Sequence, residues 1–108
     1  MIRDIADTIV RRVLEQADPV RIYVFGSAAR GEARPDSDLD ILVVEDGEFG
    51  RDRPRWRELS RIRRGLADIK GPKDVLLFSA LEFDYWKDSP NHVIGDCVRE
   101  GVLVYARS

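Results

Sequence analysis

The chain has 108 residues, 44% of them hydrophobic and 35% charged, with a formal net charge of −2 and a pI near 5.4. This length and apolar content predict one domain over residues 1–108 with a core of its own, and the near balance of charges argues against nucleic acid as a partner. The sequence holds no apolar run of the roughly 18 residues that a membrane helix needs and no signal-peptide pattern at its start. Cys97 has no second cysteine to pair with. We therefore expect a cytoplasmic protein with no membrane contact and no internal disulfide.

Hydrophobic periodicity predicts the element order helix-strand-strand-helix-strand-helix-strand. In the predicted helices apolar residues recur three and four positions apart, whereas the predicted strands are short apolar runs rich in β-branched residues. This order is typical of a small mixed β-sheet with helices packed on it, an α/β (α+β) fold. The predicted helices cover residues 2–17, 54–70 and 90–100, and the predicted strands cover residues 20–25, 39–44, 75–78 and 102–105.

The second predicted helix has a proline near each end. Pro54 suits its first turn, and Gly71-Pro72 is expected to end it. The polar residues 45–53 that precede it contain two glycines, so they are the best candidate for a mobile loop. The apolar stripe expected on this helix consists of Trp56, Leu59, Ile62, Leu66 and Ile69.

The last predicted helix begins at Ser89-Pro90, with the serine as N-cap and the proline as first helical residue. Residues 80–88 before it fit neither a helix nor a strand clearly. Gly101 is expected to end the helix, and the strand after it is expected at an edge of the sheet. The buried face expected on this helix consists of Val93, Ile94, Cys97 and Val98.

Two aspartates, Asp38 and Asp40, stand at the start of the second predicted strand. Because side chains alternate along a strand, both carboxylates are expected on one face of the sheet. Two carboxylates this close repel each other unless one is protonated or cations bind them. Mg²⁺ prefers oxygen ligands and commonly binds one or two carboxylates together with substrate phosphates. Alone, such a pair fits a solvated turn before a strand, so its meaning depends on its neighbours.

A Ca²⁺-binding loop does not explain this acidic segment. The spacing of Asp36, Asp38 and Asp40 resembles the start of such a loop. However, Ile41 and Gly47 stand where that loop requires glycine and glutamate.

Gly26 and Ser27 follow the first predicted strand. A glycine there lets a backbone N–H approach a phosphate, and the serine hydroxyl adds a second donor, although a helix cap would use the same geometry. A helical stub after them would favour an anion at its N-terminus. With Asp38 and Asp40 on the next strand, a phosphate cradle would lie beside a metal pair, as phosphoryl transfer requires.

Asp74, at the start of the third predicted strand, is the third carboxylate expected for the second metal or for general-base work. It follows a helix long enough to cross the sheet, and it opens its strand as Asp38 and Asp40 open theirs. Arg30 and Arg34 fit phosphate contacts and solvated loop positions about equally, and Arg30 is the stronger candidate of the two. The weaker carboxylate candidates lie in a polar segment where acidic side chains are ordinary: Glu82, Asp84 and Asp88.

Gly26-Ser27, ten further residues and then Asp38-Leu39-Asp40 resemble the signature of the DNA polymerase beta-like nucleotidyltransferase superfamily. The fuller string over residues 26–40 resembles that of its minimal branch, the MNT domains, and the resemblance covers nearly the whole chain. It implies this fold, ATP as a substrate and two Mg²⁺ ions as cofactors. By analogy, Gly26 and Ser27 contact the triphosphate and Asp38 and Asp40 bind metal. Asp74 then takes the role of the third carboxylate and helps to activate an acceptor hydroxyl.

The same resemblance implies a biological role. Many MNT domains are encoded beside a HEPN-domain protein, and some act as antitoxins that transfer AMP to a tyrosine of that toxin. We therefore expect a protein adenylyltransferase that acts as a type VII-like antitoxin on a HEPN partner. Larger relatives carry a second domain for the acceptor, and its absence here favours a protein partner. The oligomeric state and the nucleobase preference stay open.

Two other functions fit the same family. In the first, the fold is a binding module that neutralises a partner toxin by complex formation without catalysis, which the set of acidic residues argues against. In the second, the chain is similar to antibiotic-modifying nucleotidyltransferases and uses a small hydroxylated acceptor, which the short chain argues against.

Arginines crowd one segment of the chain. They fit first the solvated face of a helix and second a basic surface that docks an acidic partner or RNA, and the overall acidity weakens the RNA version. Trp56 and Trp86 are expected in the core or an interface, Tyr23 and Cys97 as structural residues, and His92 as a non-catalytic residue in a first helical turn. The arginines are Arg51, Arg53, Arg55, Arg57, Arg61, Arg63 and Arg64.

Overall fold

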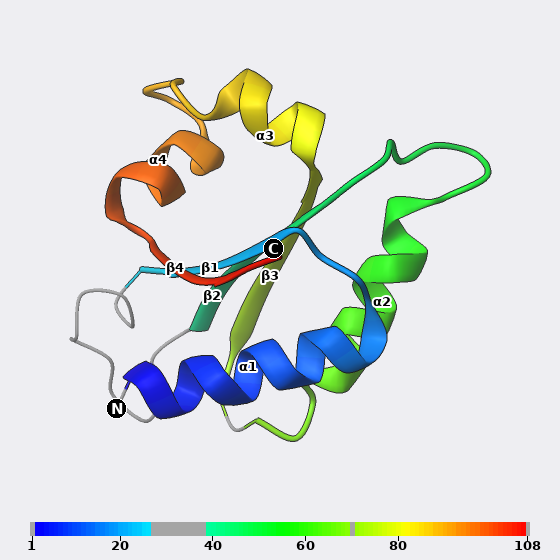
Figure 1. Cartoon of the computed structure of the whole chain (residues 1–108), viewed down its shortest axis with the longest axis vertical. Helices are drawn as coiled ribbons and strands as arrows, with labels where there is room; N and C mark the ends of the chain where they lie inside the picture. Colours follow the sequence, from blue (N-terminus) through cyan, green and yellow to red (C-terminus); the bar gives the residue numbers. More distant parts are fainter. Residues whose placement is uncertain (1, 27–38, 70, 108) are drawn as a thin grey trace.

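A computed structural model describes residues 2–26, 39–69 and 71–107, and shows a four-stranded mixed sheet between two layers of helices (Figure 1). The strand order is β3-β2-β1-β4, with β1 antiparallel to β2 and β4, and β2 parallel to β3. This confirms the predicted fold class. None of the helices in these ranges has the length and apolar composition of a bilayer span. The elements are α1 (Ile2–Gln16), β1 (Arg21–Phe25), β2 (Leu39–Glu45), α2 (Arg55–Gly65), β3 (Lys73–Ser79), α3 (Ala80–Trp86), α4 (Val93–Glu100) and β4 (Val102–Ala106).

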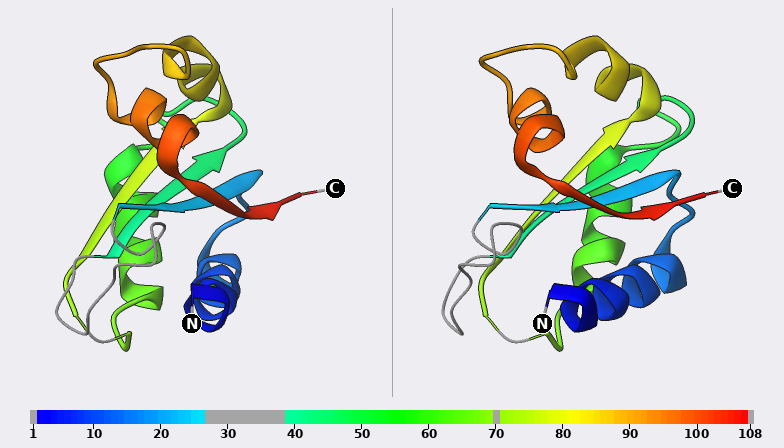
Figure 2. Two further views of the ribbon diagram at one scale, coloured as in Figure 1. Left: turned by 90° about the vertical axis from the view of Figure 1, so that its left-hand side faces the viewer. Right: turned by 60° about the vertical axis from the view of Figure 1, so that its left-hand side comes forward.

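Strand β2 is covered on both faces, as its continuous apolar run predicts. Figure 2 shows α1 and α2 on one side of the sheet and α3 and α4 on the other. Ile41 and Val43 pack in the core on the α1 and α2 side, whereas Leu42 and Val44 pack in the core on the opposite side. Within β2, Asp40 is the one residue that is not buried. The strand therefore fills the middle of the molecule and leaves a single polar side chain near its start partly open to solvent.

The two cores are of unequal size. The larger joins the sheet to α1 and α2, and the smaller joins it to α3 and α4. Burying each large aliphatic side chain stabilises the fold by about 1.5–3 kcal/mol relative to leaving it exposed. The larger core contains Ile9, Val13, Ile22, Val24, Leu39, Ile41, Val43, Ile62, Leu66, Val75 and Leu77, and the smaller contains Leu42, Val44, Phe83, Ile94 and Cys97.

Helix α2 is shorter than predicted. Pro54 is its N-cap rather than its first helical residue, and the helix ends at Gly65, well before Gly71. A Cβ at Gly65 would lie 3.1 Å from the carbonyl oxygen of Arg12, so glycine lets α1 approach α2 closely here. The prediction that Trp56 belongs to the buried stripe is wrong, because its side chain is 65% exposed. Six residues separate it from fully buried Ile62, which places the two on different sides of a 3.6-residue repeat.

Residues 80–86, which the hydrophobic pattern left ambiguous, form α3. The Ser79 hydroxyl accepts a hydrogen bond from the Glu82 backbone N–H (3.1 Å), and the Glu82 carboxylate accepts one from the Ser79 N–H (2.8 Å). This is a complete capping box. Because Ser79 is also the last residue of β3, the strand passes directly into the helix.

Helix α4 begins later than predicted. Its N-cap is His92, whose Nδ1 accepts the Ile94 N–H at 3.1 Å, so the prediction of Ser89-Pro90 as the helix start is wrong. Cys97 is buried as predicted, and burial raises the pKa of its thiol to about 12. Val98 was expected in the buried face but is 44% exposed. Gly101 caps the C-terminus of the helix, and β4 follows at the sheet edge, as predicted.

Replacement of Gly95 by alanine is expected to destabilise the fold by at least about 2 kcal/mol. Alanine is the better helix former, but its Cβ would lie 1.9 Å from the Ser89 carbonyl oxygen. The matched control is Gly50→Ala, because a Cβ at Gly50 meets no atom within 4 Å. Urea unfolding of both variants measures the difference, and equal midpoints would contradict the packing of residue 89 against α4.

Candidate active site

The candidate site lies where β1 ends and β2 and β3 begin. Because β1 runs antiparallel to β2, and β2 runs parallel to β3, these three strand ends meet at one end of the sheet (Figure 1). Phe25, the last residue of β1, pairs with Asp40. Asp40 in turn pairs with Asp74. Residues far apart in the sequence therefore meet in one row across the sheet.

Asp40 and Asp74 occupy matching positions on neighbouring parallel strands. Both lie on the face of the sheet that α3 and α4 cover further along, since side chains two positions on, Leu42 and Leu76, pack in that core. Neighbouring strands lie about 4.8 Å apart, so both carboxylates can reach one cation. Asp40 is partly exposed and Asp74 is exposed. The pair is thus accessible and rich in the oxygen donors that Mg²⁺ prefers.

Gly26 makes room for the Asp40 carboxylate. Its φ is 76°, a left-handed conformation that glycine adopts without strain. A Cβ at this position would lie 2.1 Å from Oδ2 of Asp40. The backbone conformation and the packing therefore both require glycine here, and the carboxylate leans over the turn that leaves β1.

Four of the predicted site residues, Ser27, Arg30, Arg34 and Asp38, lie outside the described residues, so the predictions about them stay predictions. In the described ranges, no three acidic, histidine or cysteine side chains gather into a potential metal site. Asp40 and Asp74 supply two carboxylates of the proposed set. The weaker candidates Glu82, Asp84 and Asp88 follow the far end of β3 and do not join them.

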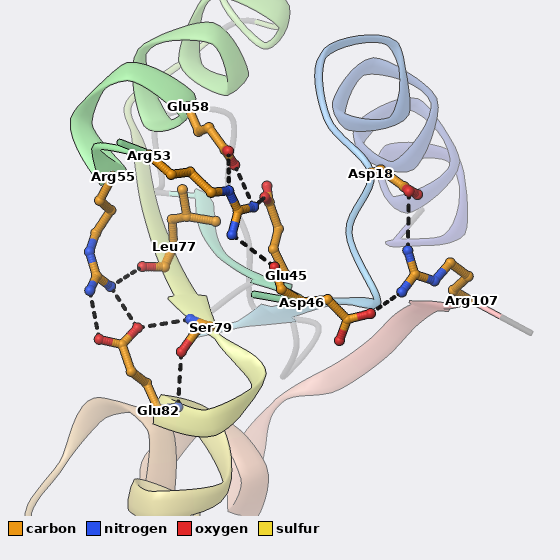
Figure 3. Close-up of polar contacts among 10 residues, drawn as sticks. All are labelled: Asp18, Glu45, Asp46, Arg53, Arg55, Glu58, Leu77, Ser79, Glu82 and Arg107. Atoms are coloured by element: carbon orange, nitrogen blue, oxygen red, sulfur yellow. Dashed lines mark hydrogen bonds and ion pairs between the residues drawn. The ribbon is translucent and has the colours of Figure 1, made fainter. Parts of the chain in front are cut away.

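A second polar cluster lies at the opposite end of β2, and sequence reasoning missed it (Figure 3). The Arg53 guanidinium donates to Glu45 (2.5 Å) and to Glu58 (2.7 Å and 3.2 Å). It also donates to the Asp46 carbonyl oxygen at 2.8 Å. The available signal was Glu45 itself, a carboxylate directly after the apolar run of β2, where it is only 3% exposed.

Glu45 and Glu58 share this environment unequally. The pKa of Glu45 is raised to about 8, mainly by burial and also by the hydrogen bond and the negative charge of Glu58, while Arg53 and Arg61 act to lower it. Burial acts to raise the pKa of Glu58 as well, but hydrogen bonds with Glu45 and Arg53 lower it overall. One proton therefore stays on Glu45 near neutral pH. Oε2 of Glu45, which is buried and has no hydrogen-bond partner in the described part of the chain, is the oxygen suited to carry that proton.

Arg55 anchors the start of α2 to the end of β3 (Figure 3). Its guanidinium donates to the Leu77 carbonyl oxygen (2.8 Å) and to both oxygens of Glu82 (2.9 Å and 2.6 Å). The hydrogen bonds from Arg55 are the main reason that the pKa of Glu82 is lowered. The guanidinium carbons of Arg53 and Arg55 lie 4.6 Å and 4.7 Å from the Phe49 ring centroid. Residues 45–53, the best candidate for a mobile loop from the sequence, are thus tied to two other elements.

Comparison with known proteins places this arrangement in a known class. The family model of the nucleotidyltransferase domain matches residues 6–103, which include Gly26, Asp40 and Asp74. No curated protein sequence matches the chain. A candidate nucleotidyltransferase from Sulfolobus solfataricus, solved at 1.40 Å resolution, is 26% identical with a TM-score of 0.63, covering 98% of this chain and 81% of that one.

Two complexes contain chains of the same fold. One is a toxin-antitoxin with AMP-PNP, where the similar chain is 19% identical with a TM-score of 0.62, over 95% of this chain and 74% of that one. The other is a tri-AMPylated Shewanella oneidensis HEPN toxin with MNT antitoxin, where the values are 18% and 0.52, over 99% and 74%. At these identities the likeness concerns the fold alone.

Replacement of Glu45 by glutamine is expected to flatten the dependence of stability on pH. The folded-state pKa of about 8 lies above the ordinary 4.5, so the folded chain holds this proton more tightly than the unfolded chain. The resulting stability is complete below pH 4.5 and is lost as pH rises through 8, a change on the order of 2 kcal/mol. Urea unfolding at intervals from pH 5 to 8.5 measures it. The exposed Glu48→Gln should keep the wild-type slope, and an equal slope in Glu45→Gln would contradict the shared proton.

Proposed function

The chain belongs to the nucleotidyltransferase domain family, and we propose that it is a Mg²⁺-dependent enzyme that transfers AMP from ATP to a hydroxyl group of a protein partner. The observation that carries this proposal is the in-register pair of Asp40 and Asp74 beside Gly26. Asp38, two residues before Asp40 in the sequence, is proposed to complete the set.

The proposed roles follow from the chemistry of each group. Asp38, Asp40 and Asp74 would hold two Mg²⁺ ions, since all three are oxygen donors. Bound Mg²⁺ neutralises charge on the triphosphate and on the leaving pyrophosphate. The turn at Gly26 exposes backbone at the strand end, and Ser27 and Arg30 are proposed to bind the triphosphate through hydrogen bonds.

Transfer forms one bond to the α-phosphorus and breaks another. The acceptor oxygen attacks the α-phosphorus of ATP, the bond from that phosphorus to the bridging oxygen of the β-phosphate breaks, and pyrophosphate leaves with that electron pair. The proton of the acceptor hydroxyl passes to a carboxylate, and Asp74 is proposed to accept it because its side chain is exposed at the sheet edge. The Asp40 carboxylate lies over Gly26, in space that a Cβ would fill.

We infer that the acceptor is a tyrosine of a HEPN-domain toxin, and that the chain acts in the cytoplasm as a type VII-like antitoxin. Support comes from the fold shared with two toxin-antitoxin structures, one of which holds an AMPylated HEPN toxin. The structural match extends over nearly the whole of this chain in both comparisons. In this reaction the acceptor hydroxyl belongs to the partner, so this fold does not have to supply it.

The direct test is transfer of label from α-³²P-ATP to a co-expressed HEPN-domain partner in the presence of Mg²⁺. Wild type is expected to label the partner, and Asp40→Asn and Asp74→Asn are expected to lower the rate at least about a hundredfold, as loss of a proton acceptor or metal ligand does. The matched control is Asp88→Asn, an exposed carboxylate in the segment between α3 and α4, which should keep the wild-type rate.

The rival function, neutralisation by complex formation alone, predicts a different pattern. The partner would then bind without becoming labelled. Asp40→Asn, Asp74→Asn and Asp88→Asn would all neutralise it as well as wild type does. Calorimetric titration of ATP adds a second measurement, because the proposed site requires binding that depends on Mg²⁺. Absent or metal-independent ATP binding would favour the rival.

Gly26→Ala is expected to lower the rate of transfer about a hundredfold by displacing the Asp40 carboxylate. The control is Gly47→Ala, whose φ of 82° imposes a similar backbone penalty. Its Cβ would lie 3.0 Å from the Arg53 guanidinium, at the end of β2 away from Asp40. Both variants should lose stability, and only Gly26→Ala should lose transfer when rates are measured on folded protein. Equal rates in the two variants would contradict the proposed role of Gly26.

A further inference from the structure

The outward half of α2 carries positive charge and no negative charge. All of its residues are exposed: Arg57, Ser60 and Arg64 lie on the side of the helix opposite the buried Ile62 and Leu66, and the others flank them. We call this surface the arginine face. It consists of Trp56, Arg57, Ser60, Arg61, Arg63 and Arg64.

The arginines of this face form no ion pair within the described ranges, although the charge of Arg61 acts to lower the pKa of Glu45 and of Glu58. Arg53 and Arg55, just before them, are bound to Glu45, Glu58 and Glu82. The four arginines of the face form no ion pair with any described residue, and Arg57 contacts only the Trp56 ring, 5.5 Å from its centroid. The fold therefore uses the first two arginines to hold itself together, Arg61 adds its charge beside Glu45 and Glu58, and Arg57, Arg63 and Arg64 have no such role among the described residues.

The arrangement weakens the helix that carries it. Arg57 and Arg61 are four residues apart and Arg61 and Arg64 are three apart, so like charges face each other along the helix. Nothing in the core requires charge at these exposed positions. An anionic surface laid on the face would offset this repulsion, and the guanidinium group is suited to paired hydrogen bonds with carboxylate or phosphate.

The charge of the whole chain favours a protein over a nucleic acid as that surface. The chain has 20 acidic and 18 basic residues, so its net charge is negative. An extended polyanion that continued past α2 would therefore be repelled by the rest of the surface. A protein with a local acidic surface would meet only the face itself. Trp56, 65% exposed beside Arg57, adds a large rigid contact area. Tryptophan and arginine are the residues that most often dominate the binding energy of protein interfaces.

We propose that the arginine face docks an acidic surface of a protein partner, with carboxylates paired to Arg57, Arg61 and Arg64 and with Trp56 packed beside them. This docking is independent of nucleotide transfer. The side chains of the face point away from the sheet, and Asp40 and Asp74 lie on the sheet face that α2 does not cover. A docked partner therefore leaves the two carboxylates open.

The test is a ¹H–¹⁵N NMR titration of the full chain with a polyglutamate peptide, without nucleotide or metal. A single-stranded RNA of matched charge is titrated in parallel. The expected result is a saturable shift of the amide signals of α2 and of the Trp56 indole N–H with polyglutamate, with affinity that falls as salt rises. RNA should bind more weakly.

Two matched variants localise the effect. Arg57→Glu should weaken polyglutamate binding about tenfold, as reversal of a contacting charge does. Its fold should be kept, because an acidic residue in the first turn of a helix is favoured there, and thermal unfolding checks this. Arg11→Glu changes the net charge equally on exposed α1 and should leave affinity within about twofold.

Three results would overturn the proposal. The first is the absence of saturable shifts in α2, and the second is an equal loss of affinity in Arg11→Glu and Arg57→Glu. The third is tighter binding of RNA than of polyglutamate on the same face, which would assign the face to nucleic acid. No transfer activity enters this experiment, so its failure is distinguishable from failure of the proposed enzymatic function.

Discussion

The parallel pairing of β2 with β3 is the constraint on which the candidate site depends. It sets Asp40 opposite Asp74 and puts both on one face of the sheet. Because side chains alternate along a strand, a slip of one residue would send Asp74 to the other face. The register is held by the same apolar side chains that form both cores, and by α2, which crosses from the end of β2 to the start of β3. Stability of the fold and geometry of the site therefore have a common origin.

Local patterns predicted most of the elements but not how their ends meet. The buried central strand, the edge strand and the glycine after β1 follow from short-range rules of periodicity and backbone freedom. The start of α4 does not, because Ser89-Pro90 is a good helix start in isolation. In the folded chain the Ser89 carbonyl packs where a Cβ of Gly95 would lie, so the chain folds back over α4 instead of entering it. The register of Asp40 and Asp74 is likewise a long-range property, and sequence could only suggest it.

Charge is distributed differently at the two ends of the sheet. At one end Asp40 is partly exposed and Asp74 is exposed. At the other end Arg53 and Arg55 pair with Glu45 and Glu82 and pack against Phe49, so the acidic side chains there have arginine partners within the chain. The arginine face runs along α2 between the two ends. Of the seven arginines in this segment, Arg53 and Arg55 thus stabilise the fold, and the four of the arginine face are the ones proposed to meet a partner.

The central claim is that nucleotide and metal bind at the end of the sheet where Asp40 and Asp74 lie. Mn²⁺ can replace Mg²⁺ as a hard divalent cation, and its unpaired electrons broaden NMR signals of nearby nuclei. With a non-hydrolysable ATP analogue present, added Mn²⁺ should broaden the amide signals of Gly26, Asp40 and Asp74 first. Broadening that centres instead on Glu45 and Asp46 at the far end, or that does not depend on nucleotide, would contradict the account.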